Sequence, residues 1–155
     1  MENFFAIIGG MGTQATELFV HELNSKVNAK KDQDYPNYLL FNHASVPDRT
    51  AYILGQSELC PFDFLSEDIK QLEPLKPNFI AIPCNTSHYF YEDLQALTSI
   101  PILHMPRLAV QSVKIRFPLT KKVGIVATTG TLKSGIYDKE ILDAGYEPVK
   151  PDTAL

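Results

Sequence analysis

The sequence predicts an α/β fold in which helices flank a parallel sheet. Short apolar runs bounded by glycine or proline alternate along the chain with longer amphipathic stretches, and this alternation is typical of βαβ units. The 155 residues are 45% hydrophobic and 21% charged, an ordinary composition for a globular protein with one good core. A pattern repeated near the two ends indicates that the complete fold has two similar lobes.

Five apolar runs predict the strands. Their lengths suit strands better than helices, and turn-forming or polar residues border them. In chain order, the predicted strands cover residues 4–8, 38–41, 79–82, 100–103 and 123–127. Strands of a parallel sheet are buried on both faces and are therefore continuous in apolar residues, so these runs favour a parallel sheet.

The amphipathic stretches predict the helices. They cover residues 14–28, 62–72, 87–97, 107–116 and 134–144. In the first of them Ala15, Leu18, Phe19 and Leu23 recur at the spacing of one helical face. We expect these faces to pack on the sheet.

One connection, residues 42–55, is longer than most links between neighbouring elements. It carries His43, Asp48 and Arg49, whose side chains can bind a ligand or transfer protons. Long loops are frequently active-site loops. Spacing alone favours a solvated loop, so both interpretations stay open.

A weak internal repeat relates the two ends of the chain. Residues 7–13 align with residues 125–131, and Phe19 then aligns with Tyr137. Two related units of strand, turn and helix are typical of a fold with two similar lobes. The repeat therefore sets the expected organisation of the chain.

This organisation consists of a first α/β lobe over residues 1–117, which contains Cys84, and the start of a second, truncated lobe over residues 118–155. A complete second copy would be longer than that segment, so the counterpart of Cys84 is expected after Leu155. Residues 122–155 supply about one βα unit with open sheet edges. We expect this segment to be disordered, docked on the first lobe, or paired with another chain.

Composition and charge exclude several classes of function. The net charge is −4 and the Lys and Arg residues are scattered, so nucleic acid has no electrostatic footprint on this chain. No apolar run approaches the roughly 20 residues of a membrane span, and the N-terminal segment lacks the positive flank of a signal peptide. We expect a cytoplasmic protein without nucleic-acid or membrane partners, in which Cys60 and Cys84 stay reduced.

Cys84 stands where a buried run ends and a helix begins, the usual position of chemistry in an α/β sheet. The N–H groups and the positive dipole end of a helix N-terminus favour the thiolate over the thiol. Cysteine is also among the most often buried residue types, so simple packing is the alternative. The polar run Asn85, Thr86 and Ser87 that follows favours a functional thiol, which acts as an acid/base or as a nucleophile.

The segment from Gly10 to Ala15 satisfies the glycine-rich dinucleotide-binding pattern after a predicted strand. Dinucleotide binding also requires an acidic residue at the end of the second strand, where this chain has Asn42. A carboxylate cradle made of backbone N–H groups at a helix N-terminus is the more economical role. A tight turn that needs glycine for its backbone freedom is the remaining alternative.

Two further patterns carry imidazole and hydroxyl groups. Cys84 and His88 fall on one helical face, but a structural zinc site usually has four ligands, so we expect no metal. His88 either activates the thiol or is a solvated helix residue. Thr128, Thr129 and Thr131 follow another predicted strand, where hydroxyl groups suit a carboxylate ligand and Thr131 would also cap a helix.

Four of these segments together resemble the aspartate/glutamate racemase family. They are Gly9-Gly10-Met11-Gly12, Pro47-Asp48-Arg49, Pro83-Cys84-Asn85-Thr86-Ser87-His88, and Thr129-Gly130-Thr131 with Tyr137. Their order and spacing fit along nearly the whole chain, and the Pro-Cys-Asn-Thr block is the specific part. The resemblance implies two lobes, each with a parallel sheet, and a cofactor-independent proton transfer at the α-carbon of an amino acid held between them. In the family two cysteines, one per lobe, face each other.

The resemblance also implies roles for individual residues. Inversion of an α-carbon requires a base on one face and an acid on the other, together with donors that stabilise charge on the carboxylate. Cys84 is then the acid/base of the first lobe, and Arg49 binds a carboxylate of an acidic substrate. The other substrate-binding residues implied are Gly10, Met11, Gly12, Asn85, Thr86, Thr129 and Thr131.

The family's second cysteine motif is not found in these 155 residues. Three functions are therefore compared: a racemase of aspartate or glutamate, an inactive fragment or pseudoenzyme that binds a small carboxylate, and a dinucleotide-binding module. The Pro-Asp-Arg motif beside the Pro-Cys-Asn-Thr block favours the amino-acid branch over the related hydantoin racemases, maleate isomerases and arylmalonate decarboxylases. Association as a homodimer stays open.

Overall fold

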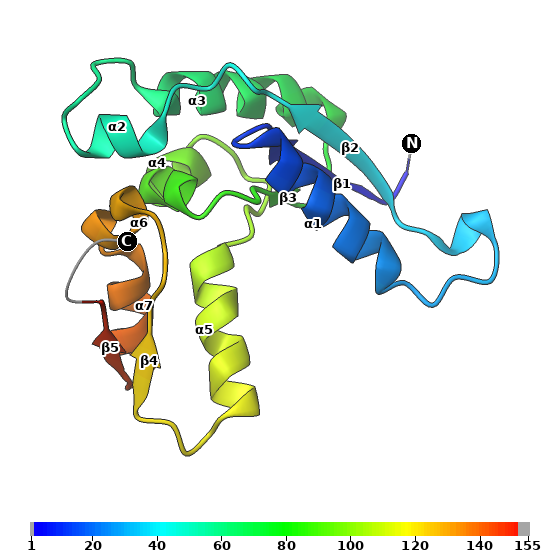
Figure 1. The fold of residues 1–155 in the computed structure, drawn as a ribbon. Helices are drawn as coiled ribbons and strands as arrows, with labels where there is room; N and C mark the ends of the chain where they lie inside the picture. Colours follow the sequence, from blue (N-terminus) through cyan, green and yellow to red (C-terminus); the bar gives the residue numbers. More distant parts are fainter. Residues whose placement is uncertain (1, 152–155) are drawn as a thin grey trace. The chain divides into compact units, whose positions relative to one another are not determined.

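The computed structural model describes residues 2–151, which form two compact units (Figure 1). The units are built from interleaved segments of the chain. Unit 1 takes the chain up to Val46, Phe62–Cys84 and Glu92–Leu103, and unit 2 takes Pro47–Pro61, Asn85–Tyr91 and the chain from His104 onward. The lobe boundary expected after residue 117 stays a prediction.

Unit 1 contains a parallel sheet with the strand order β2-β1-β3. Gly9 of β1 lies opposite Asn42 of β2, and Ile7 of β1 lies opposite Ala81 of β3. The strands are β1 (Phe4–Gly9), β2 (Asn37–Asn42) and β3 (Ile80–Ala81). The predicted parallel sheet is confirmed, and the carboxyl ends of these strands share one edge.

Helix α3 packs through regularly spaced apolar residues, whereas the apolar face predicted for α1 is not buried: Ala15 and Leu18 are exposed, and Phe19 and Leu23 are half-buried. Leu65, Ile69 and Leu72 of α3 are fully buried, and their spacing places them on one helical face. In Figure 1, α3 runs above β2 and α1 runs below it. The helical elements are α1 (Thr13–Ser25), α3 (Pro61–Leu72) and α4 (Tyr91–Ala96), with the short 3-10 helices η1 (Asp32–Asp34) and η2 (Glu73–Leu75).

The predicted strand at residues 100–103 forms only an isolated parallel bridge, between Ile80 and Ile102. Ile80 N–H donates to the carbonyl oxygen of Pro101, and Leu103 N–H donates to that of Ile80, both at 2.8 Å. Pro101 has no N–H group, which limits a regular ladder at this position. The segment therefore lies beside β3 without becoming a full strand.

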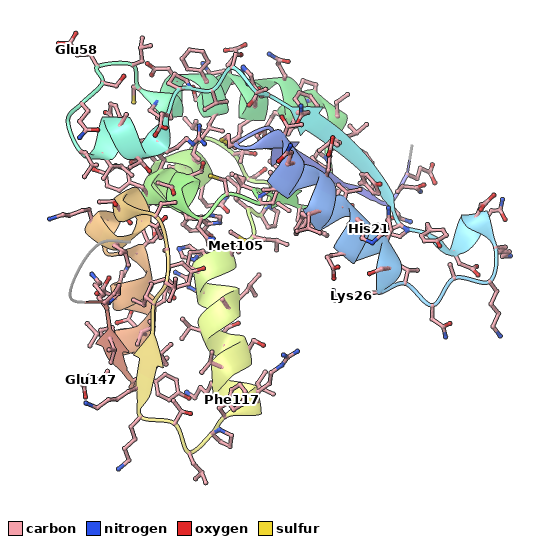
Figure 2. The ribbon with its side chains drawn as sticks, in the orientation of Figure 1. His21, Lys26, Glu58, Met105, Phe117 and Glu147 are labelled. Atoms are coloured by element: carbon pink, nitrogen blue, oxygen red, sulfur yellow. The ribbon has the colours of Figure 1, made fainter. Side chains whose placement is uncertain are left out.

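Unit 2 combines short helices with a pair of parallel strands. Val123 of β4 lies opposite Pro148 of β5. Figure 2 marks Met105 and Phe117 at the two ends of α5 and Glu147 at the start of β5. The elements are α2 (Arg49–Ile53), η3 (Thr86–Phe90), α5 (Met105–Arg116), β4 (Lys122–Gly124), α6 (Thr129–Ser134), α7 (Ile136–Asp143) and β5 (Glu147–Val149).

The core of unit 2 is a cluster of buried side chains from its helices and strands. It consists of Val110, Ile125, Ile141 and Tyr146. Residues of the segment after 121 make up most of this cluster, so that segment, as far as residue 151, is folded rather than disordered. Within residues 2–151, no helix has both the length and the apolar character needed to cross a membrane.

Two predictions about the helices need correction. The connection 42–55 contains α2, which Asp48 caps by accepting the N–H of Ala51 at 2.9 Å, so it is not a plain loop. The helix predicted over 134–144 is confirmed as α7, but a further short helix, α6, precedes it and was not predicted; Gly135 adopts a left-handed conformation (φ 68°) and ends α6 before α7 begins.

Candidate active site

The glycine turn follows β1 at the carboxyl edge of unit 1. Gly10 has a φ of +89°, and a Cβ atom there would lie 2.5 Å from the carbonyl carbon of His43. Only glycine therefore allows the turn to approach the chain that leaves β2. Gly10 N–H donates to Thr16 Oγ1 at 3.0 Å, and Thr16 Oγ1 donates to the carbonyl oxygen of Gly12 at 2.9 Å.

These bonds refine the carboxylate cradle predicted for the turn. The N–H of Gly10 is already bound by α1, so a carboxylate at this edge would meet the first N–H groups of α1 instead. Asn42, where a dinucleotide site would need an acidic residue, donates through Nδ2 to Thr13 Oγ1 at 3.3 Å. The side chain at the end of β2 thus supports the start of α1.

Cys84 lies at the same edge of unit 1, just after β3, and is buried. Its N–H donates to the carbonyl oxygen of Ile82 at 2.8 Å. Since β3 pairs with β1, and neighbouring strands lie about 4.8 Å apart, the thiol and the glycine turn follow adjacent strands. The next residues start η3, with Asn85 as its N-cap, so the predicted position between a strand and a helix is confirmed.

Three threonine hydroxyl groups of unit 2 meet in a triangle, which we call the hydroxyl cluster. Thr86 Oγ1 lies 2.8 Å from Thr131 Oγ1 and 3.3 Å from Thr128 Oγ1, and the last two atoms are 3.1 Å apart. Thr128 caps α6 by accepting the N–H of Thr131, so the cap expected at Thr131 is wrong by one turn. Thr129, between these two residues in sequence, is the first residue of α6.

Asn85 and Tyr137 form a polar pair in unit 2. The hydroxyl group of Tyr137 donates to Asn85 Oδ1 at 2.6 Å. Burial raises the pKa of the Tyr137 phenol. Both side chains line a cavity of about 250 Å³ whose other walls are mainly apolar, including Val110, Val123 and Ile125.

Arg49 begins α2 and donates through Nη1 to the carbonyl oxygen of Pro47 at 2.8 Å. The next residue of α2, Thr50, lies against Gly130 of α6, where a Cβ atom would come within 2.5 Å of Thr50 Oγ1. Glycine at position 130 therefore permits the close packing of α2 on α6. The Pro-Asp-Arg motif thus caps and begins α2, which packs beside α6, the helix that carries Thr131 of the hydroxyl cluster.

His88 is buried in unit 2, and its Nε2 accepts the N–H of Met105 at 3.1 Å. The interpretation of His88 as a solvated helix residue is therefore wrong, because the ring fixes the start of α5. His104 Nδ1 accepts the N–H of Arg107 at 3.1 Å, and burial lowers the pKa of His104. Among residues 2–151, no group of His, Cys, Asp and Glu side chains has the arrangement of a metal site.

A second polar pair, which was not predicted from the sequence, joins His43 and Asp68 in unit 1. His43 Nδ1 lies 2.9 Å from both carboxylate oxygens of Asp68. Asp68 is buried, and burial raises the pKa of its carboxyl group, while the bond to His43 opposes that rise. The two residues are 25 positions apart, so only the packing of α3 against the end of β2 could reveal the pair.

The predicted site residues are distributed over both units. Those of unit 1 are Gly10, Met11, Gly12 and Cys84, and those of unit 2 are Arg49, Asn85, Thr86, Thr129 and Thr131. Within unit 1 the structure brings the glycine turn and the thiol to one sheet edge. Within unit 2 it brings Thr86 and Thr131 into hydrogen-bonding distance.

A sequence profile described as Asp/Glu/Hydantoin racemase matches residues 8–155. The chain belongs to this racemase family. Among curated proteins, the broad specificity amino-acid racemase RacX of Bacillus subtilis (strain 168) is 29% identical over 150 residues, which are 94% of this chain and 63% of RacX. A glutamate racemase of Lysinibacillus sphaericus is 30% identical over 111 residues, which are 63% of this chain and 40% of that protein.

Solved structures of racemases share the fold. The Picrophilus torridus aspartate racemase superposes with a TM-score of 0.86 at 32% identity, over 97% of this chain and 63% of that one. A glutamate racemase of Francisella tularensis in complex with D-glutamate gives a TM-score of 0.66 at 20% identity, over 97% of this chain and 53% of that one. The chain thus spans 63% of the length of RacX and of the aspartate racemase.

Proposed function

We propose that this chain carries one half of the active site of an amino-acid racemase, with Cys84 as one of two acid/base thiols. The observation that carries the proposal is the position of Cys84 at the carboxyl end of β3, beside the glycine turn of β1, in a chain of the racemase family. The second thiol would come from outside residues 1–155. No cofactor takes part in the proposed reaction.

The reaction is a proton exchange at the α-carbon. The Cys84 thiolate takes the α-proton, and the electron pair of the C–H bond moves toward the carboxylate group. A proton returned to the opposite face by the second thiol inverts the configuration, so the atoms of substrate and product are the same. Because an α-proton is a very weak acid, donors must stabilise the charge that develops on the carboxylate.

In the proposal each unit, taken by itself, holds donors suited to a carboxylate. The first N–H groups of α1, next to Gly12, and the hydroxyl groups of Thr86 and Thr131 are suited to an anion. Asn85 adds an amide. We propose aspartate or glutamate as the substrate because the guanidinium of Arg49 suits a second carboxylate. Because the relative RacX is named a broad specificity amino-acid racemase, neutral amino acids should be tested as well.

Deuterium exchange tests the proposal. The natural full-length polypeptide that contains these residues is incubated in deuterium oxide with each enantiomer of aspartate and glutamate, and loss of the α-proton signal is followed by NMR. We expect Cys84→Ala to lower the exchange rate by about a thousandfold or more. Cys60→Ala is the matched control and should stay within about twofold of the wild type. Equal rates for Cys84→Ala and the wild type would overturn the proposal.

An inactive fragment or pseudoenzyme that binds a small carboxylate is the second candidate, because the chain spans only 63% of the length of RacX and of the aspartate racemase. Titration of the 155-residue chain with L-aspartate, followed by NMR, separates the two functions. Binding without α-proton exchange supports the fragment, and exchange at the rate of the full-length polypeptide excludes it. A cytoplasmic location and a homodimer stay predictions.

A further inference from the structure

The hydrogen bond from Tyr137 occupies the oxygen end of the Asn85 side-chain amide. The Tyr137 hydroxyl donates to Asn85 Oδ1 at 2.6 Å, and an asparagine amide has one acceptor oxygen and one NH₂ group with two donors. With the oxygen turned toward Tyr137, the Nδ2 hydrogens are directed elsewhere. A carboxylate oxygen of a ligand can accept hydrogen bonds from these Nδ2 hydrogens. A ligand group that can only donate finds no acceptor at this position.

The tyrosine is well placed to hold this orientation. It is the second residue of α7, and α7 is anchored in the core of unit 2 by the fully buried Ile141. An ion pair of 2.7 Å between Lys150 and Asp138 holds the same turn of α7 to the segment that follows β5. Because burial raises the pKa of the phenol, the hydroxyl group keeps its proton and acts as a donor to Oδ1.

We propose that Tyr137 is a positioning residue that sets the amide orientation of Asn85, so that its Nδ2 donors, and not its acceptor oxygen, are presented to the carboxylate of the substrate. This inference rests on the proposed function, because it assigns Asn85 to substrate binding. Loss of the hydroxyl group frees the amide to rotate. The donors are then presented to the ligand for only part of the time.

The kinetic test compares Tyr137→Phe with the wild type in the full-length polypeptide. We expect the KM for L-aspartate to rise and kcat to fall, so that kcat/KM falls by about tenfold, the size of effect that one hydrogen bond supports. The binding affinity for L-aspartate, measured by NMR titration, should fall by a similar factor. Tyr146→Phe is the matched control, because Tyr146 lies buried in the core of the same unit, and it should leave both quantities unchanged.

A second variant keeps the test decisive if Tyr137→Phe does not fold. Asn85→Asp retains an oxygen that accepts from Tyr137 but has no donors, so the fold should persist. We expect its affinity for L-aspartate to fall by about a hundredfold, since a repulsive charge also faces the ligand. Unchanged affinity in this variant would overturn the inference.

An NMR readout separates this inference from the proposed function. In the ¹⁵N-labelled 155-residue chain, the Nδ2 signals of Asn85 are those that Asn85→Asp removes. Tyr137→Phe should shift and broaden them, whereas Tyr146→Phe should not. If these signals stay in place and kcat/KM is unchanged, the inference is wrong. If no amino acid exchanges or binds in the wild type, the proposed function fails, while the signals still show whether Tyr137 orients the amide.

Discussion

Gly10, which has no side chain, determines how the chain turns at the carboxyl edge of the sheet in unit 1. The turn comes within contact of the backbone at His43 and Ala44, and its φ is positive. Both constraints act on the same residue, and neither involves a flexible side chain that could move away. The turn that precedes α1 therefore depends on glycine for geometric reasons that are independent of any ligand.

We expect Gly10→Ala to lower the free energy of unfolding by about 3 kcal/mol, from the strained φ and the backbone overlap together. Urea unfolding followed by circular dichroism measures this change. Gly124→Ala is the control, because nothing lies within 4 Å of a Cβ atom there and its φ is not positive. The control should stay within about 0.5 kcal/mol of the wild type. Equal losses in the two variants would show that crowding at position 10 has no effect.

Single residues also mark what the sequence could and could not predict about the site. Cys84 was predictable because the buried run before it and the polar run after it are local signals. The bond between Tyr137 and Asn85 joins residues 52 positions apart, and no local pattern reports such a contact. The hydrogen bond from the Gly10 N–H to Thr16 could not be predicted either, because a glycine-rich pattern does not show which N–H groups already donate within the protein.

Among the elements, α5 and α7 are joined by apolar packing and by a buried carboxylate. Ile141 is fully buried, and its neighbour Leu142 is 60% exposed. Arg107 donates to both oxygens of Glu140, through Nε at 3.1 Å and Nη2 at 3.2 Å. These two kinds of contact lead to separate predictions.

Ile141→Ala should destabilise the protein by about 3 kcal/mol, because it removes a fully buried side chain and leaves a cavity. The matched variant is Leu142→Ala in the same turn of α7, for which we expect less than about 0.5 kcal/mol. Thermal and urea unfolding of both variants provide the comparison. Similar losses in both would contradict the assignment of α7's buried face.

Arg107→Met should cost about 2 to 3 kcal/mol, because it leaves the buried carboxylate of Glu140 without its bidentate partner. The double variant Arg107→Met with Glu140→Leu should regain most of that loss, since no charge is then left unpaired in the interior. A double-mutant cycle in urea measures the coupling. Simple additivity of the two single changes would argue against an ion pair that matters to stability.

The helices and strands also differ in how well the sequence predicted them. The strands β1 and β2 were predicted closely, because each is a continuous apolar run. Helix α2 was not predicted, since its five residues are too few to display a helical period and its signal is the cap at Asp48. Helix α6 was not predicted either, because its six residues are too few to display a helical period, and it ends at the left-handed Gly135.

For the molecule as a whole, His104 predicts how stability depends on pH. Burial lowers the pKa of His104 below its usual value of 6.5; Glu140 opposes this shift, and His88 and Arg107 add to it. The folded state therefore binds this proton less tightly than the unfolded state. The resulting contribution to stability is present above pH 6.5 and is lost as the pH falls through the lowered pKa.

Urea unfolding between about pH 8 and about pH 5 measures this dependence. We expect the stability of the wild type to fall on acidification, and that of His104→Asn to fall less. Asparagine keeps a side-chain acceptor for the N–H of Arg107 at the start of α5, so the variant removes the titration and retains the cap. Parallel pH profiles for the two proteins would rule out His104 as the origin of the slope.

The interleaving of the two units has a consequence for biosynthesis. The ribosome releases the chain from its N-terminus, and domains generally fold as they emerge. Unit 1 has all of its segments once Leu103 has left the exit tunnel, whereas Pro47–Pro61 and Asn85–Tyr91 must wait for the chain that follows His104. During translation these two stretches, which include the finally buried Phe90, thus complete their packing only after the chain beyond His104 has emerged.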